Sequence, residues 1–327
     1  MGGPEGKNDD LSILLISPLE GDFFPTEVTS IESVIRLAAP VTARIRVFNQ
    51  NNLGELEVDK ISESHIIISG SDKSVHERIP YKEKIADVIN MAREKGKRLL
   101  GICWGHQFIA ERLGGEVFVA QEYPDIPLRP EFGVVPLKLT PQGMEDPIFN
   151  RLRAGGKEGE EEESIFDPVF YMTHMDHVKQ PPYKCKRVQV LAQTDQYPNQ
   201  VLRIDDHIIT TQMHPELIKI QVMHFIDHAR KELIRILGKD KFRNQFPDWE
   251  EGAKKSVMES FRAAELNGMQ FMRNFYYGPE VLADQLVLDI FSETGSDEMT
   301  PEAYRRFVFV EGEGADGEAE EETDEEE

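Results

Sequence analysis

Short apolar runs bounded by turn residues recur along the first third of the chain. They cover residues 13–16, 65–68 and 98–102, and each suits a strand that is buried on both faces of a sheet. Residues 44–48 alternate polar with apolar side chains, which favours a fourth strand with one exposed face. These four segments predict the strands of a largely buried sheet.

Helical spacing of apolar residues lies between those runs. Residues 26–39 place their apolar side chains on one helical face, and residues 80–95 follow the i, i+3, i+4, i+7 pattern. The second of these segments begins with Pro80 and stops at Gly96, the order in which proline and glycine usually flank a helix. A third helix is expected over 106–113. Strands alternating with helices predict an α/β fold with a doubly wound, flavodoxin-like, mostly parallel sheet.

The pattern changes after residue 115 and becomes rich in strands with short connections. Strands are expected over residues 133–139, 169–172, 187–193, 201–204 and 207–213. Two helices follow, one from 216 to about 237 and one marked by apolar spacing between 257 and 275. The fold therefore has a β-rich second half and extra C-terminal helices.

Composition predicts the limits of the domains. The expected parts are a disordered N-terminus at 1–10, a main domain at 11–237, a helical C-terminal extension at 238–310 and a disordered acidic tail at 311–327. Residues 153–168, rich in Gly and Glu, are expected to form an acidic mobile insertion within the main domain.

The net charge of −23 argues against a broad electrostatic hold on nucleic acid or on an acidic membrane surface. Eleven of the seventeen residues at 311–327 are Asp or Glu, so nearly half of the net charge lies in this tail. Such a segment buries too little apolar surface to offset its ordering entropy, and we expect it to keep the protein soluble. The alternative is a docking tail for a basic partner.

The two cysteines, Cys103 and Cys185, form no disulfide framework, which fits a reducing compartment. The first residues show no basic region followed by an apolar core, and no apolar run approaches the length that spans a bilayer. We expect a soluble protein of the cytoplasm, with the nucleus as a second compartment.

A sharp turn is predicted where the strand at 98–102 ends. Gly101-Ile102-Cys103-Trp104-Gly105 has the form Gly-x-nucleophile-x-Gly, in which small flanking residues allow a tight bend that exposes the central side chain. Cys103 stands just before the following helix, whose dipole favours the thiolate. The backbone N–H of Trp104 points to the place where an oxyanion would form. Cys103 is therefore the candidate nucleophile.

A thiolate nucleophile needs a base and a group that orients the base. His214 follows a predicted strand in Gln212-Met213-His214-Pro215-Glu216, and Glu216 lies two residues on. We expect Glu216 to hold one imidazole nitrogen of His214 while the other faces Cys103.

These motifs resemble the class I glutamine amidotransferase family. The resemblance rests on Gly101-Ile102-Cys103-Trp104-Gly105-His106-Gln107 followed, about 110 residues later, by His214-Pro215-Glu216. It runs from roughly residue 11 to residue 229. It implies that Cys103 attacks an amide carbonyl and forms a γ-glutamyl thioester, that His214 carries the proton to the departing nitrogen, and that Glu216 orients His214.

The resemblance also assigns roles around the nucleophile. The oxyanion hole would pair the N–H of Trp104 with that of Gly70, where many members have two adjacent glycines and this chain has Gly70-Ser71. Gln107 would help to bind the glutamyl part of the substrate. His174 opens a His-x-Asp segment of the kind that the family has near its site.

Other candidate sites are weaker. Cys185 lacks the flanking glycines and is expected to be a bystander, although Lys184 and Lys186 beside it would lower its pKa. His224 and His228 have helical spacing, but the residue after His224 is not the Glu that a zinc protease needs. No metal, nucleotide or other cofactor is expected.

Three functions remain open. The preferred one is a stand-alone hydrolase of glutamine or of a γ-glutamyl amide or peptide, of the γ-glutamyl peptidase type, because the residues outside the main domain carry no phosphate-binding motif of a synthetase. Its partner would be a small γ-glutamyl substrate. The second is a glutaminase subunit that donates ammonia to a separate synthetase. The third is a binding module without catalysis.

Overall fold

The computed structural model describes residues 11–18, 43–49, 51–123, 128–150, 152 and 167–277. The helix expected over 26–39, the two expected disordered ends, most of the acidic insertion and the extension beyond residue 277 lie outside the described residues. The domain limits therefore stay predictions. None of the helices in the described ranges combines the length and the apolar composition that crossing a bilayer requires.

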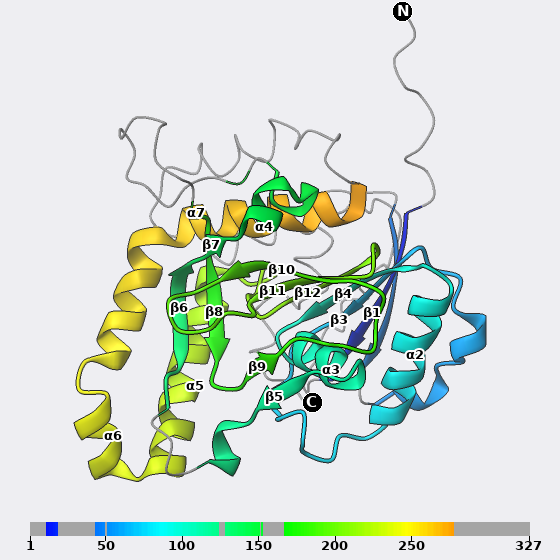
Figure 1. Cartoon of the computed structure of the whole chain (residues 1–327). Helices are drawn as coiled ribbons and strands as arrows, with labels where there is room; N and C mark the ends of the chain where they lie inside the picture. Colours follow the sequence, from blue (N-terminus) through cyan, green and yellow to red (C-terminus); the bar gives the residue numbers. More distant parts are fainter. Residues whose placement is uncertain are drawn as a thin grey trace, which may run out of the picture.

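A sheet of eight strands forms the centre of the molecule, in the order β2-β1-β3-β4-β12-β11-β10-β7 (Figure 1). Its strands are β1 (Ser12–Ser17), β2 (Arg44–Asn49), β3 (His65–Ile68), β4 (Arg98–Ile102), β7 (Lys138–Leu139), β10 (Val188–Gln193), β11 (Val201–Ile204) and β12 (Ile208–Thr211). The strands from β2 to β12 run parallel to one another, and β11, β10 and β7 extend the sheet by antiparallel pairing. The order β2-β1-β3-β4 is that of flavodoxin-like sheets, so the expected fold class is confirmed.

Two short strand pairs and the helices surround this sheet. β5 (Glu116–Phe118) pairs antiparallel with β9 (His177–Gln180), and β6 (Glu131–Pro136) pairs antiparallel with β8 (Val169–His174). The helices in the described ranges are α2 (Lys82–Glu94), α3 (Trp104–Arg112), α4 (Pro141–Glu145), α5 (Lys219–Leu237), α6 (Lys239–Gln245) and α7 (Trp249–Tyr277). Short 3-10 turns lie at η1 (Leu53–Glu55), η2 (Val58–Lys60), η3 (Ala120–Glu122) and η4 (Pro147–Phe149).

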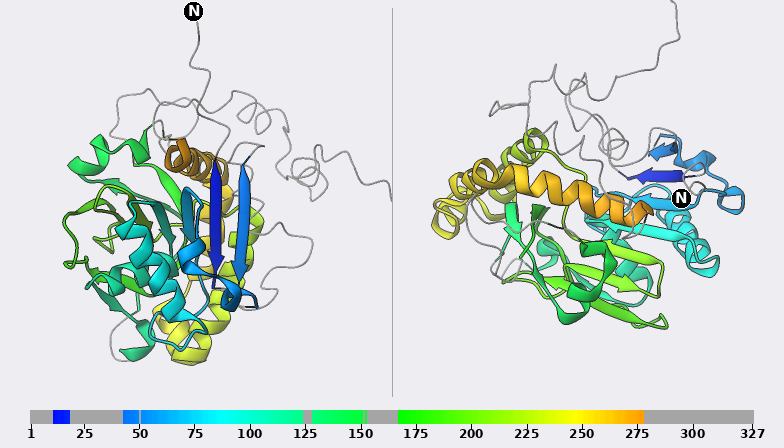
Figure 2. Two further views of the ribbon diagram at one scale, coloured as in Figure 1. Left: turned by 90° about the vertical axis from the view of Figure 1, so that its right-hand side faces the viewer. Right: turned by 90° about the horizontal axis from the view of Figure 1, so that it is seen from above.

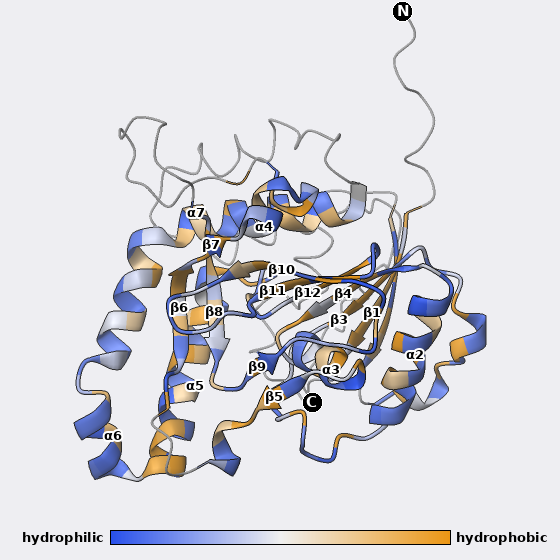
Figure 3. Cartoon of the chain, in the orientation of Figure 1, coloured by the Kyte–Doolittle hydropathy of each residue, from blue (hydrophilic) through white to orange (hydrophobic). Residues whose placement is uncertain are grey.

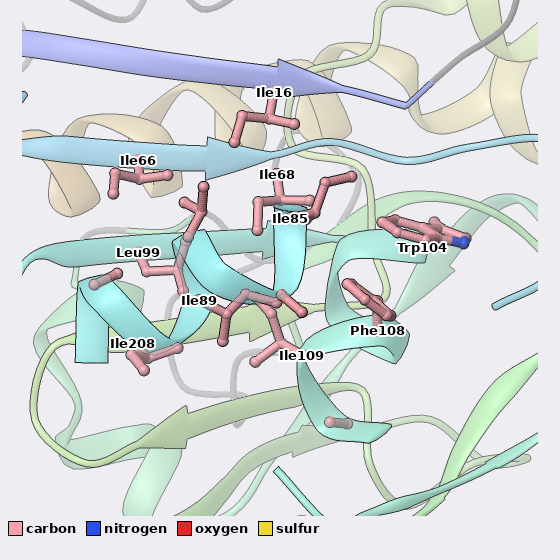
Figure 4. Packing of buried hydrophobic residues seen from close by; sticks show 14 of the residues in the cluster. Ile16, Ile66, Ile68, Ile85, Ile89, Leu99, Trp104, Phe108, Ile109 and Ile208 are labelled. Carbon is pink, nitrogen blue, oxygen red and sulfur yellow. The ribbon is translucent and has the colours of Figure 1, made fainter. Parts of the chain in front are cut away.

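One face of the sheet packs against α2 and α3. On this face, four adjacent strands place side by side Leu14, Ile66, Leu99 and Ile208. Alternate residues of a strand share a face, so the side chains two positions away point to the same side. Figure 4 shows Ile85 and Ile89 of α2 and Phe108 and Ile109 of α3 closing over Ile66, Leu99 and Ile208. This apolar layer fixes where α3 begins relative to the end of β4.

The opposite face packs against α7. Ile13, Leu15, Ile67 and Leu100 point to this side, where Phe271, Met272 and Phe275 of α7 join them in a second core. Figure 2 shows α7 running across the molecule, and Figure 3 shows apolar residues concentrated in the strands between the helical layers. A helix of the expected C-terminal extension therefore covers part of the second face of the sheet.

Most expected strands and helices are present, with shifted ends. The single strand expected over 133–139 is wrong: β6 ends at Pro136, and β7 belongs to the central sheet instead. Pro136 still faces Val169 and Leu137 donates its N–H to the carbonyl of Pro168, after which Lys138 and Leu139 pair with β10 instead. Helix α3 begins two residues earlier than expected, and α5 begins three residues later. The short strands β5 and β9 were not expected.

Candidate active site

Cys103 lies at the carboxyl end of β4, directly before α3. Its φ of 51° and ψ of −104° are values that a non-glycine residue rarely adopts. A Cβ atom on Gly101 would lie 2.5 Å from the side chain of Ile109, and a Cβ atom on Gly105 would collide with the carbonyl oxygen of Ile68. The close packing of β3, β4 and α3 therefore requires both glycines, and the bend has the sharpness that the spacing predicted.

The strands on either side of β4 bring the other expected residues to Cys103. β3 and β12 flank β4, so the loops that follow them meet at the same edge of the sheet. Gly70 comes after β3, and a Cβ atom there would lie 3.4 Å from the Cys103 Cβ and 3.1 Å from the His214 Cε1. His214 comes after β12. Residues more than one hundred positions apart in the sequence are thus in contact.

The imidazole of His214 lies between a carboxylate and the sulfur. Its Nδ1 donates to Glu216 Oε1 over 2.8 Å, and both side chains are buried. The imidazole also interacts with the Cys103 sulfur. Burial disfavours the charged ring, but the Glu216 carboxylate and the neighbouring Cys103 sulfur outweigh it and raise the pKa of His214 to about 10. The ring therefore carries its second proton at neutral pH, beside the sulfur.

Two further side chains contact this pair, and neither was expected from the sequence. Thr173 Oγ1 lies 2.8 Å from His214 Nε2, and Gln212 Nε2 donates to Cys103 Sγ over 3.5 Å. Gln212 could have been suspected from the sequence, because the predicted strand over 207–213 ends beside His214 and side chains two apart in a strand point to the same side. Nothing in the sequence pointed to Thr173, because its approach to His214 depends on the packing of β8 beside the end of β12.

Gln107 lies at the site, as expected. It is buried, and its amide nitrogen donates to the carbonyl of Asp176 over 2.9 Å and to Gln212 Oε1 over 3.1 Å. Both amide protons are therefore used within the protein. Gln107 orients Gln212 toward the sulfur, and only its own carbonyl oxygen can accept a hydrogen bond from a substrate.

His174 lies beside the site, with both ring nitrogens engaged. Nδ1 donates to the carbonyl of Asp176 over 3.0 Å, and Nε2 lies 2.9 Å from Glu131 Oε2. Glu131 is buried and also accepts hydrogen bonds from Thr194 over 2.6 Å and from Gln200 over 2.9 Å. This network holds His174 in place. Glu131 was not expected, because nothing in the residues around it distinguishes it from other strand ends.

Asp176, in the same turn as His174, connects it to the other walls of the site. It accepts the N–H of Ala120 over 2.8 Å and a hydrogen bond from the Ser74 side chain. Burial raises the pKa of Asp176. The turn between β8 and β9 is thereby tied to η3 and to the loop that carries Gly70.

A cavity of about 140 Å³ opens over these groups. Its lining includes six of the expected residues, which are Gly70, Cys103, Gln107, His174, His214 and Glu216. Phe132, Leu217 and Phe225 form an apolar part of the same lining. The centroid of the Phe225 ring lies 6.4 Å from that of His214, so this apolar part is on the side of the imidazole.

Trp104 and Cys185 complete the account of the expected residues. The Trp104 side chain is buried and stacks on Phe108 with 4.7 Å between ring centroids, so only its backbone is available to the site (Figure 4). Its N–H belongs to the first turn of α3, where no acceptor exists within the helix. Cys185 packs against the first core and does not line the cavity. Burial and Asp205 raise its pKa, so the expected lowering by the two lysines is wrong.

Comparison with known proteins agrees with this geometry. Residues 27–224 match the family Glutamine amidotransferase class-I. Gamma-glutamyl peptidase 2 of Arabidopsis thaliana is 27% identical over 205 residues, covering 60% of this chain and 73% of the relative. A GMP synthase [glutamine-hydrolyzing] of Aeropyrum pernix is 30% identical over 152 residues, which cover 46% of this chain and only 24% of that protein.

Solved structures show the same fold. A glutamine amidotransferase from Thermotoga maritima superposes with a TM-score of 0.54 at 14% identity, covering 82% of this chain and 98% of that one. At this identity the likeness concerns the arrangement of strands and helices alone.

Proposed function

Because the chain belongs to the class I glutamine amidotransferase family, we propose that it is a cysteine-dependent hydrolase that cleaves the γ-amide bond of a γ-glutamyl compound. The observation that carries the proposal is the contact of a protonated His214 with both Cys103 and Glu216 in the lining of a cavity. A nucleophile, a proton carrier and a group that orients it are the parts that acyl transfer requires.

In the first half of the reaction the Cys103 thiolate attacks the γ-carbonyl carbon. A C–S bond forms, and the carbonyl electron pair moves to the oxygen, which the N–H groups of Trp104 and Gly70 would bind. The intermediate then collapses and the C–N bond breaks. His214 gives its Nε2 proton to the leaving nitrogen, which departs as an amine or ammonia and leaves the γ-glutamyl thioester.

In the second half water resolves the thioester. His214, now neutral, takes a proton from the water as its oxygen attacks the carbonyl carbon. The C–S bond breaks and the thiolate returns, so the products are glutamate and the free amine. Glu216 holds the ring through Nδ1 during both transfers, and Gln212 donates to the sulfur whenever it is negative.

The apolar lining beside His214 supports a substrate larger than glutamine. The leaving nitrogen must lie near His214, and so the rest of the leaving group extends along Phe225, Leu217 and Phe132. Ammonia makes no use of such a surface, whereas an amino acid or peptide with an apolar side chain buries area on it. This favours a γ-glutamyl peptide, the class of substrate after which the plant relatives are named.

A second candidate is a glutaminase subunit that supplies ammonia to a separate synthetase. The observation in its favour is the similarity to GMP synthases, of which this chain covers about a quarter. In that case glutamine turnover would depend on a second protein.

The test compares glutamine with γ-glutamyl dipeptides that have small or aromatic leaving groups, with glutamate and ammonia followed separately. We expect kcat/KM to be highest for the aromatic dipeptide. Cys103→Ala should abolish turnover, whereas Cys185→Ala should leave turnover unchanged. Phe225→Ala should reduce kcat/KM for the aromatic dipeptide about tenfold and leave glutamine unchanged, a loss of about 1.4 kcal/mol that fits the burial of part of an aromatic ring. Activity that appears only after a second protein is added would favour the subunit. If the protein shows no turnover and thiol reagents do not label Cys103, the binding module is the function that remains.

A further inference from the structure

Helix α7 contacts the segment that carries His214 and Glu216. A Cβ atom on Gly268 of α7 would collide with the carbonyl oxygen of Pro215, the residue between them. One turn earlier on α7, Glu265 Oε1 accepts the backbone N–H of Lys219 over 2.8 Å. Both contacts come from outside residues 27–224, the part of the chain that matches the family.

The contact with Lys219 supplies a hydrogen-bond acceptor for a backbone N–H at the start of α5. The first N–H groups of a helix have no acceptor within it and usually find one in the side chain of the preceding residue. That residue is Ile218, whose side chain has no oxygen or nitrogen. Glu265 accepts the first of these N–H groups, that of Lys219, from a different helix, and a carboxylate at this end also suits the helix dipole. The beginning of α5, three residues after Glu216, therefore depends on α7.

Glu265 also reaches the strand that holds His214 from the other side. The Tyr171 hydroxyl donates to Glu265 Oε1 over 3.3 Å, and the carbonyl of the same tyrosine accepts the backbone N–H of His214 over 2.9 Å. Asn267 adds a bond from α7 to the first residue of β8, the carbonyl of Val169, over 3.1 Å. One carboxylate is thus connected to both ends of the segment 214–219.

Burial of this carboxyl group is costly. The exposed fraction of Glu265 is 6%, and burial raises its pKa to about 7 against the stabilising contacts from Lys219 and Tyr171. Around it, Leu217 packs with Val257 and Ala264 of α7 in one apolar cluster. An apolar side chain would fill this place at lower cost but would leave the Lys219 N–H and the Tyr171 hydroxyl without their acceptor.

We propose that Glu265 is a positioning residue for His214, and that α7 serves the site by fixing the segment from His214 to Lys219 at both ends. The catalytic meaning of this role rests on the proposed function, whereas the fixation itself is independent of it. The displacement that matters is small, because a shift of about 1 Å at a catalytic group costs on the order of 100-fold in rate.

The test compares three variants of the full chain. Glu265→Ala removes the acceptor, Glu265→Gln keeps an oxygen that can accept from Lys219, and Val257→Ala weakens the packing of the same helix without a polar contact to the segment. Hydrogen–deuterium exchange of a peptide spanning residues 214–219 reports the fixation without any need for turnover. Hydrolysis of the best γ-glutamyl substrate reports its consequence.

We expect exchange in that peptide to accelerate at least tenfold in Glu265→Ala but not in Val257→Ala, with Glu265→Gln close to the parent protein. In hydrolysis, Glu265→Ala should lower kcat about 10- to 100-fold with KM nearly unchanged, and Glu265→Gln should restore most of it. Equal exchange in Glu265→Ala and Val257→Ala, or equal losses of kcat, would overturn the proposal. Faster exchange in Glu265→Ala from a protein that hydrolyses no γ-glutamyl compound would support the fixation and refute the proposed function instead.

Discussion

The two halves of the site are held in different ways. The half around Cys103 is built from one continuous stretch, in which β4, the bend and α3 follow each other within fifteen residues. The half around His214 is a short segment between β12 and α5 whose position depends on distant residues, namely Tyr171 on β8 and Glu265 and Gly268 on α7.

This difference separates two physical requirements. A nucleophile on a strained bend needs a rigid support close by, and contiguous secondary structure with small residues at the contact supplies it. A proton carrier needs an accurate distance to the nucleophile, and that distance can be set from outside the motif. The first half should therefore respond to changes within its own motif, and the second half to changes far away in the sequence.

Removing the negative charge behind His214 should have the largest effect on the reaction. In Glu216→Gln the pKa of His214, about 10 in the parent protein, should fall toward its usual range because the favourable charge interaction is lost. We expect kcat to fall about 10,000-fold, as when other catalytic histidines lose their orienting carboxylate. The alkaline limb of the pH–rate profile, expected near pH 10 where His214 loses its proton, should move to lower pH. An unmoved limb would show that another group controls it.

The half of the site around Cys103 should be destabilised when a methyl group is added to its bend. Gly105→Ala puts a Cβ atom against the carbonyl oxygen of Ile68 and should lower the free energy of unfolding by about 3 kcal/mol. Gly252→Ala is the matched control on α7, since apart from the adjacent residues and backbone of its own helix no described atom lies within 4 Å of its added methyl. It should raise stability by up to about 1 kcal/mol. Chemical denaturation of both variants checks this, and equal changes would contradict the close packing of the bend.

Glu265, which supports the half of the site around His214, should make the stability of the protein depend on pH. The folded-state pKa of Glu265 is raised from 4.5 to about 7, so the folded state binds the proton more tightly than the unfolded chain does. Its contribution is fully present below pH 4.5 and is lost as pH rises through about 7. The free energy of unfolding of the parent protein should therefore fall by about 2–3 kcal/mol relative to Glu265→Gln across this interval. Parallel denaturation curves at pH 4.5 and pH 8 would measure it, and a constant difference would be the contrary result.

The smallest expected effect lies where the two halves meet. Gly70→Ala places a Cβ atom 3.1 Å from His214 Cε1 and 3.4 Å from the Cys103 Cβ, so the His214 ring has to move by a few tenths of an ångström. We expect kcat to fall about tenfold, equivalent to about 1.4 kcal/mol, while stability stays nearly unchanged. Steady-state kinetics beside a thermal melt separates the two quantities. A stable variant with full activity would mean that Gly70 has more room than the contact distances indicate.

Several features could be predicted because they depend on neighbours in the sequence. The apolar runs give the strands β1, β3 and β4 with nearly correct ends, since a strand buried on both faces has to be apolar throughout. The bend at Cys103 and the short link from His214 to Glu216 are likewise visible in consecutive residues. Where the chain changes partners over a few residues, as between β6 and β7, prediction failed because pairing is decided by the rest of the sheet.

By itself, the sequence determined which groups can react: a sulfur on a bend between two glycines, and an imidazole with a carboxylate two residues away. The tertiary structure alone decided how they meet. β12 had to pair beside β4 for His214 to reach Cys103, and α7 had to cross behind that segment for Glu265 to supply the acceptor that Ile218 lacks. The physical reason is that short-range motifs encode the chemistry of a residue and its local bend, whereas distances between residues far apart depend on how whole strands and helices pack.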